Sequence, residues 1–171
     1  MIESWICKND LIYDKNLIDI FDFYVIKTPV QNVSFRGISF KDRGIKKSDI
    51  VLNKIKNISP TLYSNFYWLE KTNDDIDEMC RMNGIFGHLD SPNEYVVYRK
   101  NNNLGKTESF FYCIRCALAH GSFCIHEFNE EKYYFLENLF KEKGKKNMTL
   151  NARMVIKEST LLRIIDLCND N

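Results

Sequence analysis

The pattern of apolar and polar positions divides the chain into a helical first part and a strand-rich second part. Its clearest segment, 110–123, places apolar side chains on one broad arc when it is wound at about 3.6 residues per turn. Such an arc must be buried, so the pattern predicts a helix over about 107–120, here called the motif helix. Gly121 follows it, and glycine readily adopts the left-handed conformation that ends a helix. The apolar arc comprises Phe110, Phe111, Cys113, Ile114, Ala117 and Leu118.

Capping residues and apolar spacing predict shorter helices before the motif helix. The first ends before Thr28-Pro29, because the residue before a proline disfavours helical geometry. The third has a proline at its first position, and its apolar spacing continues through Leu69. Segment 91–98 is ambiguous, since a capping-box pattern is followed by residues that prefer a strand. The helix starts predicted in this region are Asp14, Ser48, Ser59-Pro60 and Asp74.

The pattern changes after Gly121 to short β-rich segments separated by turns. These segments predict a small antiparallel β-meander over about 123–156. Ser159 is then the N-cap of a last helix over about 159–168. No low-complexity linker or internal repeat divides the chain, so we expect residues 1–171 to form a single domain. The predicted fold class is mainly α (α+β): a helical bundle with a small antiparallel β-meander before the C-terminal helix.

Composition and charge restrict the classes of function that the chain can have, but they do not indicate one. The 171 residues are 44% hydrophobic and 27% charged, which is typical of a folded globular protein. The formal charge is only +1, so any nucleic-acid site must be local. The N-terminus has no signal-peptide pattern, and no segment approaches the roughly 20 apolar residues that span a bilayer. We therefore expect a cytoplasmic protein without membrane contact, whose six cysteines are free thiols.

The face of the motif helix opposite to the apolar arc carries a candidate anion site. Arg115 and His120 flank this face, with the small side chains of Cys116 and Ala119 between them. Arginine offers a permanently charged fork suited to phosphate, and histidine exchanges a proton near neutral pH. Metal-free RNA cleavage needs little more: a base takes the 2′-hydroxyl proton, and a cation stabilises charge on the phosphate. Tyr112 shares the face and is a candidate for stacking on a base.

The stretch 115–120, Arg-Cys-Ala-Leu-Ala-His followed by Gly-Ser-Phe, resembles the signature of the HEPN superfamily. In that family an arginine, a polar residue, three further residues and a histidine lie on a helix of a small bundle. The resemblance implies a HEPN-like bundle and a metal-independent endoribonuclease without cofactor, acting as a toxin or anti-phage (abortive-infection) effector with a cognate antitoxin. It implies that Arg115 and His120 are catalytic. Cys116 departs from the family pattern, which has asparagine or another polar residue there.

Other interpretations of the same residues stay open. Because cysteine is a poor hydrogen-bond donor, Cys116 also fits an inactive HEPN-type dimer that binds RNA or a partner protein. Arg115 and His120 also fit structural roles, in which the arginine pairs with a carboxylate and the histidine caps its helix. Together with Cys113 and Cys124, Cys116 and His120 approach the spacing of a zinc knuckle. Zinc needs four converging ligands, and Cys113 falls on the buried arc, so we predict no metal site.

Two expectations about partners follow from the nuclease interpretation. On one straight helix Arg115 and His120 diverge by roughly 140°, too far to hold one phosphate together. Two antiparallel motif helices packed through Ala119 and Cys116 would bring the arginine of one chain toward the histidine of the other, so we expect a homodimer. RNA is the expected ligand, and two basic clusters are candidates for contacting its backbone. The backbone candidates are Lys41, Arg43, Lys46, Lys47, Lys143, Lys145 and Lys146.

Overall fold

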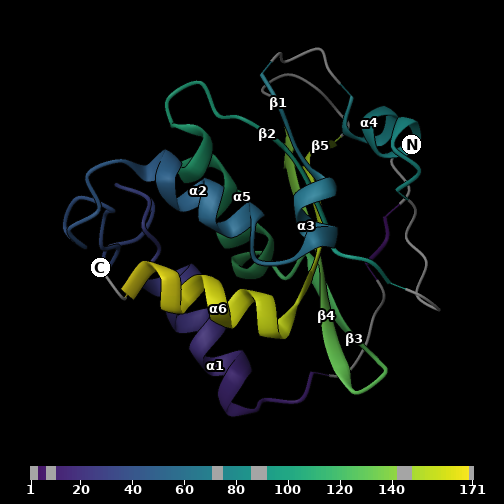
Figure 1. Ribbon diagram of the computed structural model, residues 1–171, viewed down its shortest axis with the longest axis horizontal. Coiled ribbons are helices and arrows are strands. Elements are labelled where there is room, and N and C mark those ends of the chain that lie inside the picture. The colour runs from purple at the N-terminus through teal and green to yellow at the C-terminus, as the bar shows by residue number, and fades with distance from the viewer. Residues whose placement is uncertain (1–3, 7–10, 71–74, 86–91, 142–147, 170–171) are drawn as a thin grey trace.

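A five-stranded mixed sheet forms the centre of the molecule in the computed structural model, which describes residues 4–6, 11–70, 75–85, 92–141 and 148–169 (Figure 1). The strand order is β1-β2-β5-β4-β3. The β1–β2 pair is parallel, whereas the other neighbours are antiparallel. The strands are β1 (Phe66–Leu69), β2 (Tyr95–Arg99), β3 (Phe123–Phe128), β4 (Glu131–Lys141) and β5 (Met148–Lys157).

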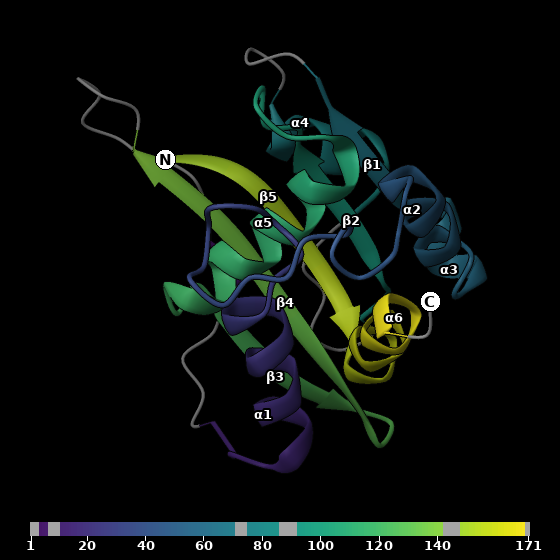
Figure 2. The ribbon, with the colours of Figure 1, turned by 90° about the vertical axis from the view of Figure 1, so that its left-hand side faces the viewer.

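Most of the helices cover one face of this sheet (Figures 1 and 2). The opposite face is covered by α4 (Ile76–Met82) and by the N-terminal segment 4–6. The short helix α3 (Pro60–Ser64) leads directly into β1. The helices on the covered face are α1 (Lys15–Phe21), the π-helix η1 (Asp22–Ile26), α2 (Ser48–Lys56), α5 (Lys106–Ala119) and α6 (Glu158–Asn169).

The motif helix is α5, and its apolar arc forms the centre of the core on the helix-covered face. Phe110, Phe111 and Ile114 are completely buried. The Phe111 ring stacks on Tyr24 at a centroid distance of 5.9 Å and meets Phe40 edge-on at 5.4 Å. Burying one such side chain contributes about 1.5–3 kcal/mol, so this arc fixes α5 firmly on the sheet. The helix therefore gives rigid support to side chains on its remaining face.

The prediction of a mainly α helical bundle is wrong, because the sheet is much larger than the meander. The predicted meander is present as β3, β4 and β5, but β2 pairs with β5 and β1 pairs with β2. These two pairings join segments far apart in the sequence and extend the meander to a five-stranded sheet. With the helices packed on this sheet, the fold class is α+β. The observed architecture is therefore not the small helical bundle that the HEPN resemblance implied.

The helix predicted to run through Leu69 ends early, and this error explains the missed strand. Ser59 caps α3 as expected, accepting a hydrogen bond from the Leu62 amide at 3.1 Å. The helix stops at Ser64, and Phe66–Leu69 forms β1. Phe66 and Leu69 are both buried, but in the cores on opposite faces of the sheet. Their spacing of three residues resembles one face of a helix, whereas in a strand it places them on opposite sides.

The N-cap predictions are confirmed in part. Asp14 caps α1, accepting from the Leu17 amide at 2.9 Å. Ser48 is instead the first residue of α2, and Ser159 lies inside α6, which begins at Glu158. The capping-box pattern before β2 forms no helix in its described part; the buried Glu94 instead accepts from Ser59 Oγ at 2.9 Å and from the Lys157 amide at 3.2 Å. Asp74 lies outside the described residues, and Asp75 is the N-cap of α4. In the part of the chain that the structure describes, every helix is too short or too polar to span a bilayer.

Candidate functional site

A pocket of about 780 Å³ lies beside the C-terminal half of α5. Its walls come from α5, from the loop after β2, and from the neighbouring ends of β4 and β5. Figure 2 shows α5 lying over the long strands that complete this wall. Most of the lining residues have polar side chains, and Leu139, Phe140 and Met148 are apolar. The polar lining residues are Arg99, Lys100, Asn101, Asn102, Asn103, Tyr112, Cys116, His120, Ser122, Asn138, Lys141 and Asn151.

The charged side chains that line this pocket are all basic, so we call it the basic pocket. Arg99, Lys100 and Lys141 are cationic, and His120 becomes cationic when it is protonated. No aspartate or glutamate belongs to the lining among the described residues. Arg99 ends β2 and is only 8% exposed, so its guanidinium lies at low dielectric, where its attraction for an anion is strong. The pocket is therefore suited to a phosphate-bearing ligand.

Two amide side chains, one of them at a β-bulge, line the pocket on the side of the sheet, here called its floor. Asn138 pairs with Ala152 and Leu139 with Leu150, so Asn151 is the extra residue on β5. The Nδ2 atoms of Asn138 and Asn151 lie 3.6 and 3.8 Å from the Sγ atom of Cys113 on α5. Both amides therefore lie on the helix side of the sheet. An asparagine amide offers both donors and an acceptor, which suits the edge of a nucleobase.

The loop that closes one side of the pocket is held by several hydrogen bonds. The Asn101 amide donates to Ser109 Oγ at 2.9 Å, and the Asn103 amide donates to Asn101 Oδ1 at 2.9 Å. The Tyr98 hydroxyl donates to the Lys106 carbonyl at 3.0 Å, tying β2 to the start of α5. This wall is therefore preorganised, which lowers the entropy lost when a ligand binds.

His120 lies at the rim of the pocket because α5 ends there. It is the C-cap of α5, and Gly121 adopts a left-handed φ of 67°, as predicted. The Ser122 amide then donates to the Ala117 carbonyl at 2.8 Å, which turns the chain into β3. His120 is exposed, so its imidazole is accessible to solvent and to a ligand in the pocket. A histidine in this position is able to accept and return a proton.

Two of the residues predicted to line the site do so. Tyr112 and Cys116 lie two turns and one turn before His120 along α5, and both contribute to the pocket wall. Cys116 is only 6% exposed. Its proximity raises the pKa of the Tyr112 hydroxyl, because a charged Cys116 thiolate disfavours ionisation of the phenol, and partial burial adds to the effect. The structure therefore brings Tyr112, Cys116 and His120 together.

The other two predicted residues, Arg115 and Ala119, are not part of the pocket lining. Ala119 is exposed, whereas Arg115 is half-buried. The Arg115 Nε atom is buried and has no hydrogen-bond partner among the described residues. The structure therefore does not join Arg115 and His120 in one pocket of a single chain. Arg99, from β2, is the arginine that shares the pocket with His120.

The residues of the two basic clusters differ in their exposure and in their contacts. Lys41, Lys46 and Lys47 are exposed. Arg43 is used structurally: its guanidinium donates to the carbonyls of Ile38 and Lys27 and lies 4.9 Å from the centre of the Phe23 ring. The candidates Lys143, Lys145 and Lys146 lie outside the described residues.

The zinc-knuckle arrangement is not formed. Cys113 belongs to the core under α5, whereas Cys124 on β3 faces the core on the opposite side of the sheet. Within the described residues, no three histidine, cysteine, aspartate or glutamate side chains are placed to hold a metal ion. The zinc interpretation therefore has no geometric support in this part of the chain.

The residues missed at the sequence level are those that strand pairing brings to α5. Arg99, Asn138 and Asn151 come from three strands, and only the pairing of β2, β5 and β4 places them together. The run 99–103, Arg-Lys-Asn-Asn-Asn, was the one local signal, because it concentrates cations and amides just before the motif helix. Comparisons with protein-family models, curated proteins and solved structures found no match.

Proposed function

We propose that the basic pocket binds single-stranded RNA, with one nucleotide and its phosphate inside the pocket. The observation that carries this proposal is the charge of the lining: all charged side chains among its described residues are cationic or become so on protonation. Arg99, Lys100 and Lys141 would contact phosphate oxygens, for which positive charge is the main requirement. The volume of about 780 Å³ is within the range of pockets for drug-sized ligands.

The uncharged lining favours a nucleotide over a simple anion. Asn138 and Asn151 present amides from the floor, and the described loop adds further asparagines. Tyr112 supplies an aromatic ring from α5. Amides that read base edges and rings that stack on bases are the usual means by which proteins hold single-stranded RNA. Such RNA exposes both features at once, whereas a paired strand hides its base edges.

We further propose that the bound strand is cleaved without a metal ion. His120 accepts the proton of the 2′-hydroxyl, and the 2′-oxygen attacks the neighbouring phosphorus. A bond forms between the 2′-oxygen and phosphorus, the bond to the 5′-oxygen breaks, and that oxygen takes a proton from water. Arg99 and Lys100 stabilise the charge that develops on the non-bridging oxygens. The products are a 2′,3′-cyclic phosphate and a 5′-hydroxyl.

Binding is tested with a 2′-O-methyl RNA strand, which cannot undergo this reaction. Replacing the pocket lysine, Lys100→Gln, should weaken binding and reduce the salt dependence by about 0.7 in the logarithmic slope, the value for one lost phosphate contact. Lys15→Gln is the matched control, because Lys15 is an exposed lysine on α1, outside the pocket. Equal effects of the two substitutions, or no binding by the wild type, would contradict the proposal.

Binding without cleavage is the second candidate. It is favoured by the position of Arg115, which does not line the pocket that contains His120. The two candidates differ in one result: a binding protein retains a natural RNA strand intact, whereas the enzyme converts it to cyclic-phosphate products. The toxin or anti-phage role and the cognate antitoxin stay predictions from the HEPN resemblance.

A further inference from the structure

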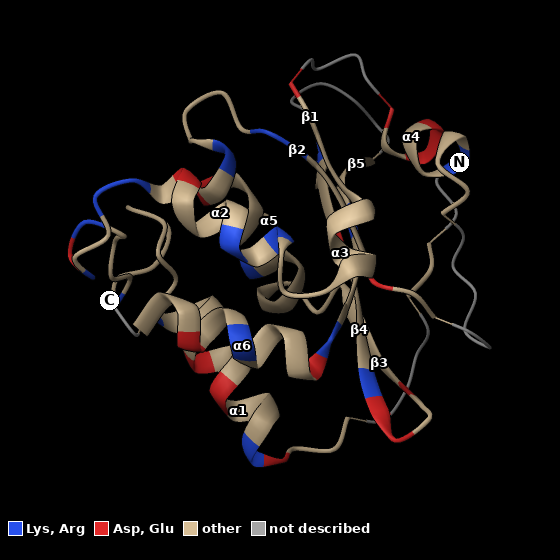
Figure 3. Ribbon diagram, viewed as in Figure 1, with Lys and Arg blue, Asp and Glu red and all other residues tan. Residues whose placement is uncertain are grey.

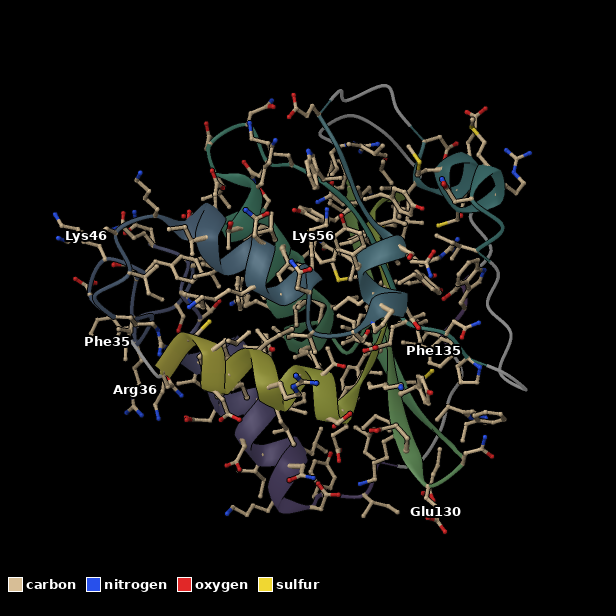
Figure 4. The ribbon with its side chains drawn as sticks, viewed as in Figure 1. Phe35, Arg36, Lys46, Lys56, Glu130 and Phe135 are labelled. Atoms are coloured by element: carbon tan, nitrogen blue, oxygen red, sulfur yellow. The ribbon has the colours of Figure 1, made fainter. Side chains whose placement is uncertain are left out.

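A turn in the loop before α2 presents an aromatic ring to solvent. The Phe35 side chain is fully exposed, at 105% of its reference area, compared with 78% for Tyr13. Figure 4 shows Phe35 and Arg36 projecting from the end of the molecule that is far from the sheet. A single exposed phenylalanine is unremarkable on its own, so the rigidity and the charge of its surroundings decide what it does.

The turn that carries Phe35 is fixed by its own hydrogen bonds. The Gly37 amide donates to the Ser34 carbonyl at 3.1 Å, so Phe35 and Arg36 are the two central residues of a β-turn. The Ser34 hydroxyl donates to the Ile26 carbonyl, which anchors the turn to η1. A Cβ atom at Gly37 would lie only 3.0 Å from the Thr28 carbonyl oxygen, so the chain packs closely here.

Arg43 holds the base of the same loop. Its Nε donates to the Ile38 carbonyl at 3.1 Å and its Nη2 to the Lys27 carbonyl at 2.9 Å. These bonds fasten both ends of the segment that includes the turn. The ring of Phe35 is therefore held in solvent by a preorganised backbone, and a partner that stacks on it meets little additional entropy cost.

The surroundings of the ring are strongly basic. Arg36, Lys41, Lys46 and Lys47 are exposed, and Figure 3 shows basic residues gathered on this loop. The acidic residue within 35–47 is Asp42, whose carboxylate accepts a hydrogen bond from Ser39 Oγ at 2.6 Å. The cations of this segment outnumber its one carboxylate, and a flat apolar ring among them matches a polyanion that also offers flat apolar faces. Single-stranded nucleic acid has that chemistry.

We propose that this Phe35 turn is a second contact for single-stranded RNA, separate from the basic pocket. An unpaired base stacks on the Phe35 ring, while Arg36, Lys46 and Lys47 contact the adjoining backbone phosphates. Every base has a flat face, so this contact tolerates any sequence, in contrast to the amide-lined pocket. The inference rests on the proposed RNA binding and extends it to the strand outside the pocket.

The test measures the affinity of a single-stranded 2′-O-methyl RNA by fluorescence anisotropy. Phe35→Ala should weaken binding about tenfold, the typical effect of removing one stacking ring, whereas Phe35→Trp should keep the wild-type affinity. Tyr13→Ala is the matched control, because Tyr13 is an exposed aromatic residue outside the loop, and it should change nothing. Phe35 is fully exposed, so the substitution leaves the core intact.

An unchanged RNA affinity in Phe35→Ala would overturn the proposal. If that variant also loses binding to vesicles of phosphatidylserine and phosphatidylcholine, the turn is a membrane contact instead. A nucleoside monophosphate separates this proposal from that of the pocket. Its binding should be the same in wild type and Phe35→Ala, and its failure to bind the wild type would contradict the pocket proposal instead.

Discussion

The Nδ2 atom of Asn138 lies 3.6 Å from the Sγ atom of Cys113, which joins β4 to α5 at the floor of the basic pocket. Asn151 reaches the same sulfur at 3.8 Å because a bulge turns it toward the helix. The thiol is completely buried, and its desolvation raises the pKa of Cys113 to about 12, so it stays protonated at neutral pH. The floor of the pocket is thus a neutral, amide-lined surface beneath cationic walls.

The first prediction concerns this floor. Asn151→Ala removes one amide and should weaken binding of 2′-O-methyl RNA by roughly three- to tenfold, the effect of one neutral hydrogen bond. Asn53→Ala, at an exposed asparagine of α2, should leave the affinity unchanged. Isothermal titration calorimetry provides both values. Equal affinities of the two variants would show that the amide does not contact the ligand.

The second prediction concerns stability on the other face of the sheet. Arg153 donates to Glu137 at 2.9 Å, and the two side chains are 2% and 1% exposed. Arg153→Met leaves the buried carboxylate without its main cation, so it should lower the free energy of unfolding by about 3–5 kcal/mol. The double substitution Arg153→Met with Glu137→Leu removes both charges and should recover much of this loss. Urea unfolding curves measure both.

The third prediction concerns alkaline pH. Burial raises the pKa of Cys168 to about 12 and of Cys80 to about 11, from an ordinary value of 9.0. The unfolded chain loses these thiol protons above about pH 9, whereas the folded chain keeps them to higher pH. Stability is therefore fully present below that pH and falls as pH rises, by about 1.4 kcal/mol per thiol at one unit above the unfolded pKa.

Chemical denaturation of wild type and Cys168→Ala on both sides of about pH 9 checks this sign. The alanine variant should lose less stability between the two pH values than the wild type does. A wild-type stability that stays constant or rises across this interval would contradict the buried, protonated state of these thiols.

How far the sequence predicted this arrangement depends on how local each signal was. The end of α5 at Gly121 and the cap at Asp14 were predictable, because a cap or a left-handed glycine is determined by the residues beside it. The inward arc of α5 was predictable from its period. Tyr112, Cys116 and His120 were accordingly placed together correctly, since one helix presents all three.

The pocket itself depended on pairings between distant segments. Arg99 lies at the end of β2, and β2 pairs with β5. The first residue of β5, Met148, lies 49 positions after Arg99 in the sequence. The bulge at Asn151 has no signature in the sequence around it. Phe66 and Leu69 had a spacing compatible with a helix, which concealed the edge strand. These features arise from tertiary pairing, and local propensity does not encode it.

The fourth prediction concerns the homodimer expected from the motif. Arg115 lies outside its own pocket and Cys116 is buried, so a two-fold contact along α5 would use the Arg115–Ala119 side of the helix. In a shared site, Arg115 of one chain adds to Arg99 and Lys100 in the pocket of the other chain. The loss of either Arg115 or His120 then stops cleavage. Arg115→Ala and His120→Ala protomers should therefore regain about a quarter of wild-type activity when mixed, because half of the dimers are mixed and each contains one complete site. Full activity of Arg115→Ala alone would show that Arg99 and Lys100 suffice. Absence of RNA cleavage after verified subunit exchange would contradict a shared site.

The most direct test of the central claim is the incubation of purified protein with total RNA in EDTA. We expect cleavage by the wild type, with products that end in 2′,3′-cyclic phosphate, and no cleavage of a DNA strand, because DNA lacks the 2′-hydroxyl. His120→Gln, at an exposed position, should remain folded and lose activity by roughly 100-fold or more, as expected for a lost proton-transfer group. A requirement for added metal, cleavage of DNA, or full activity of His120→Gln would contradict the account.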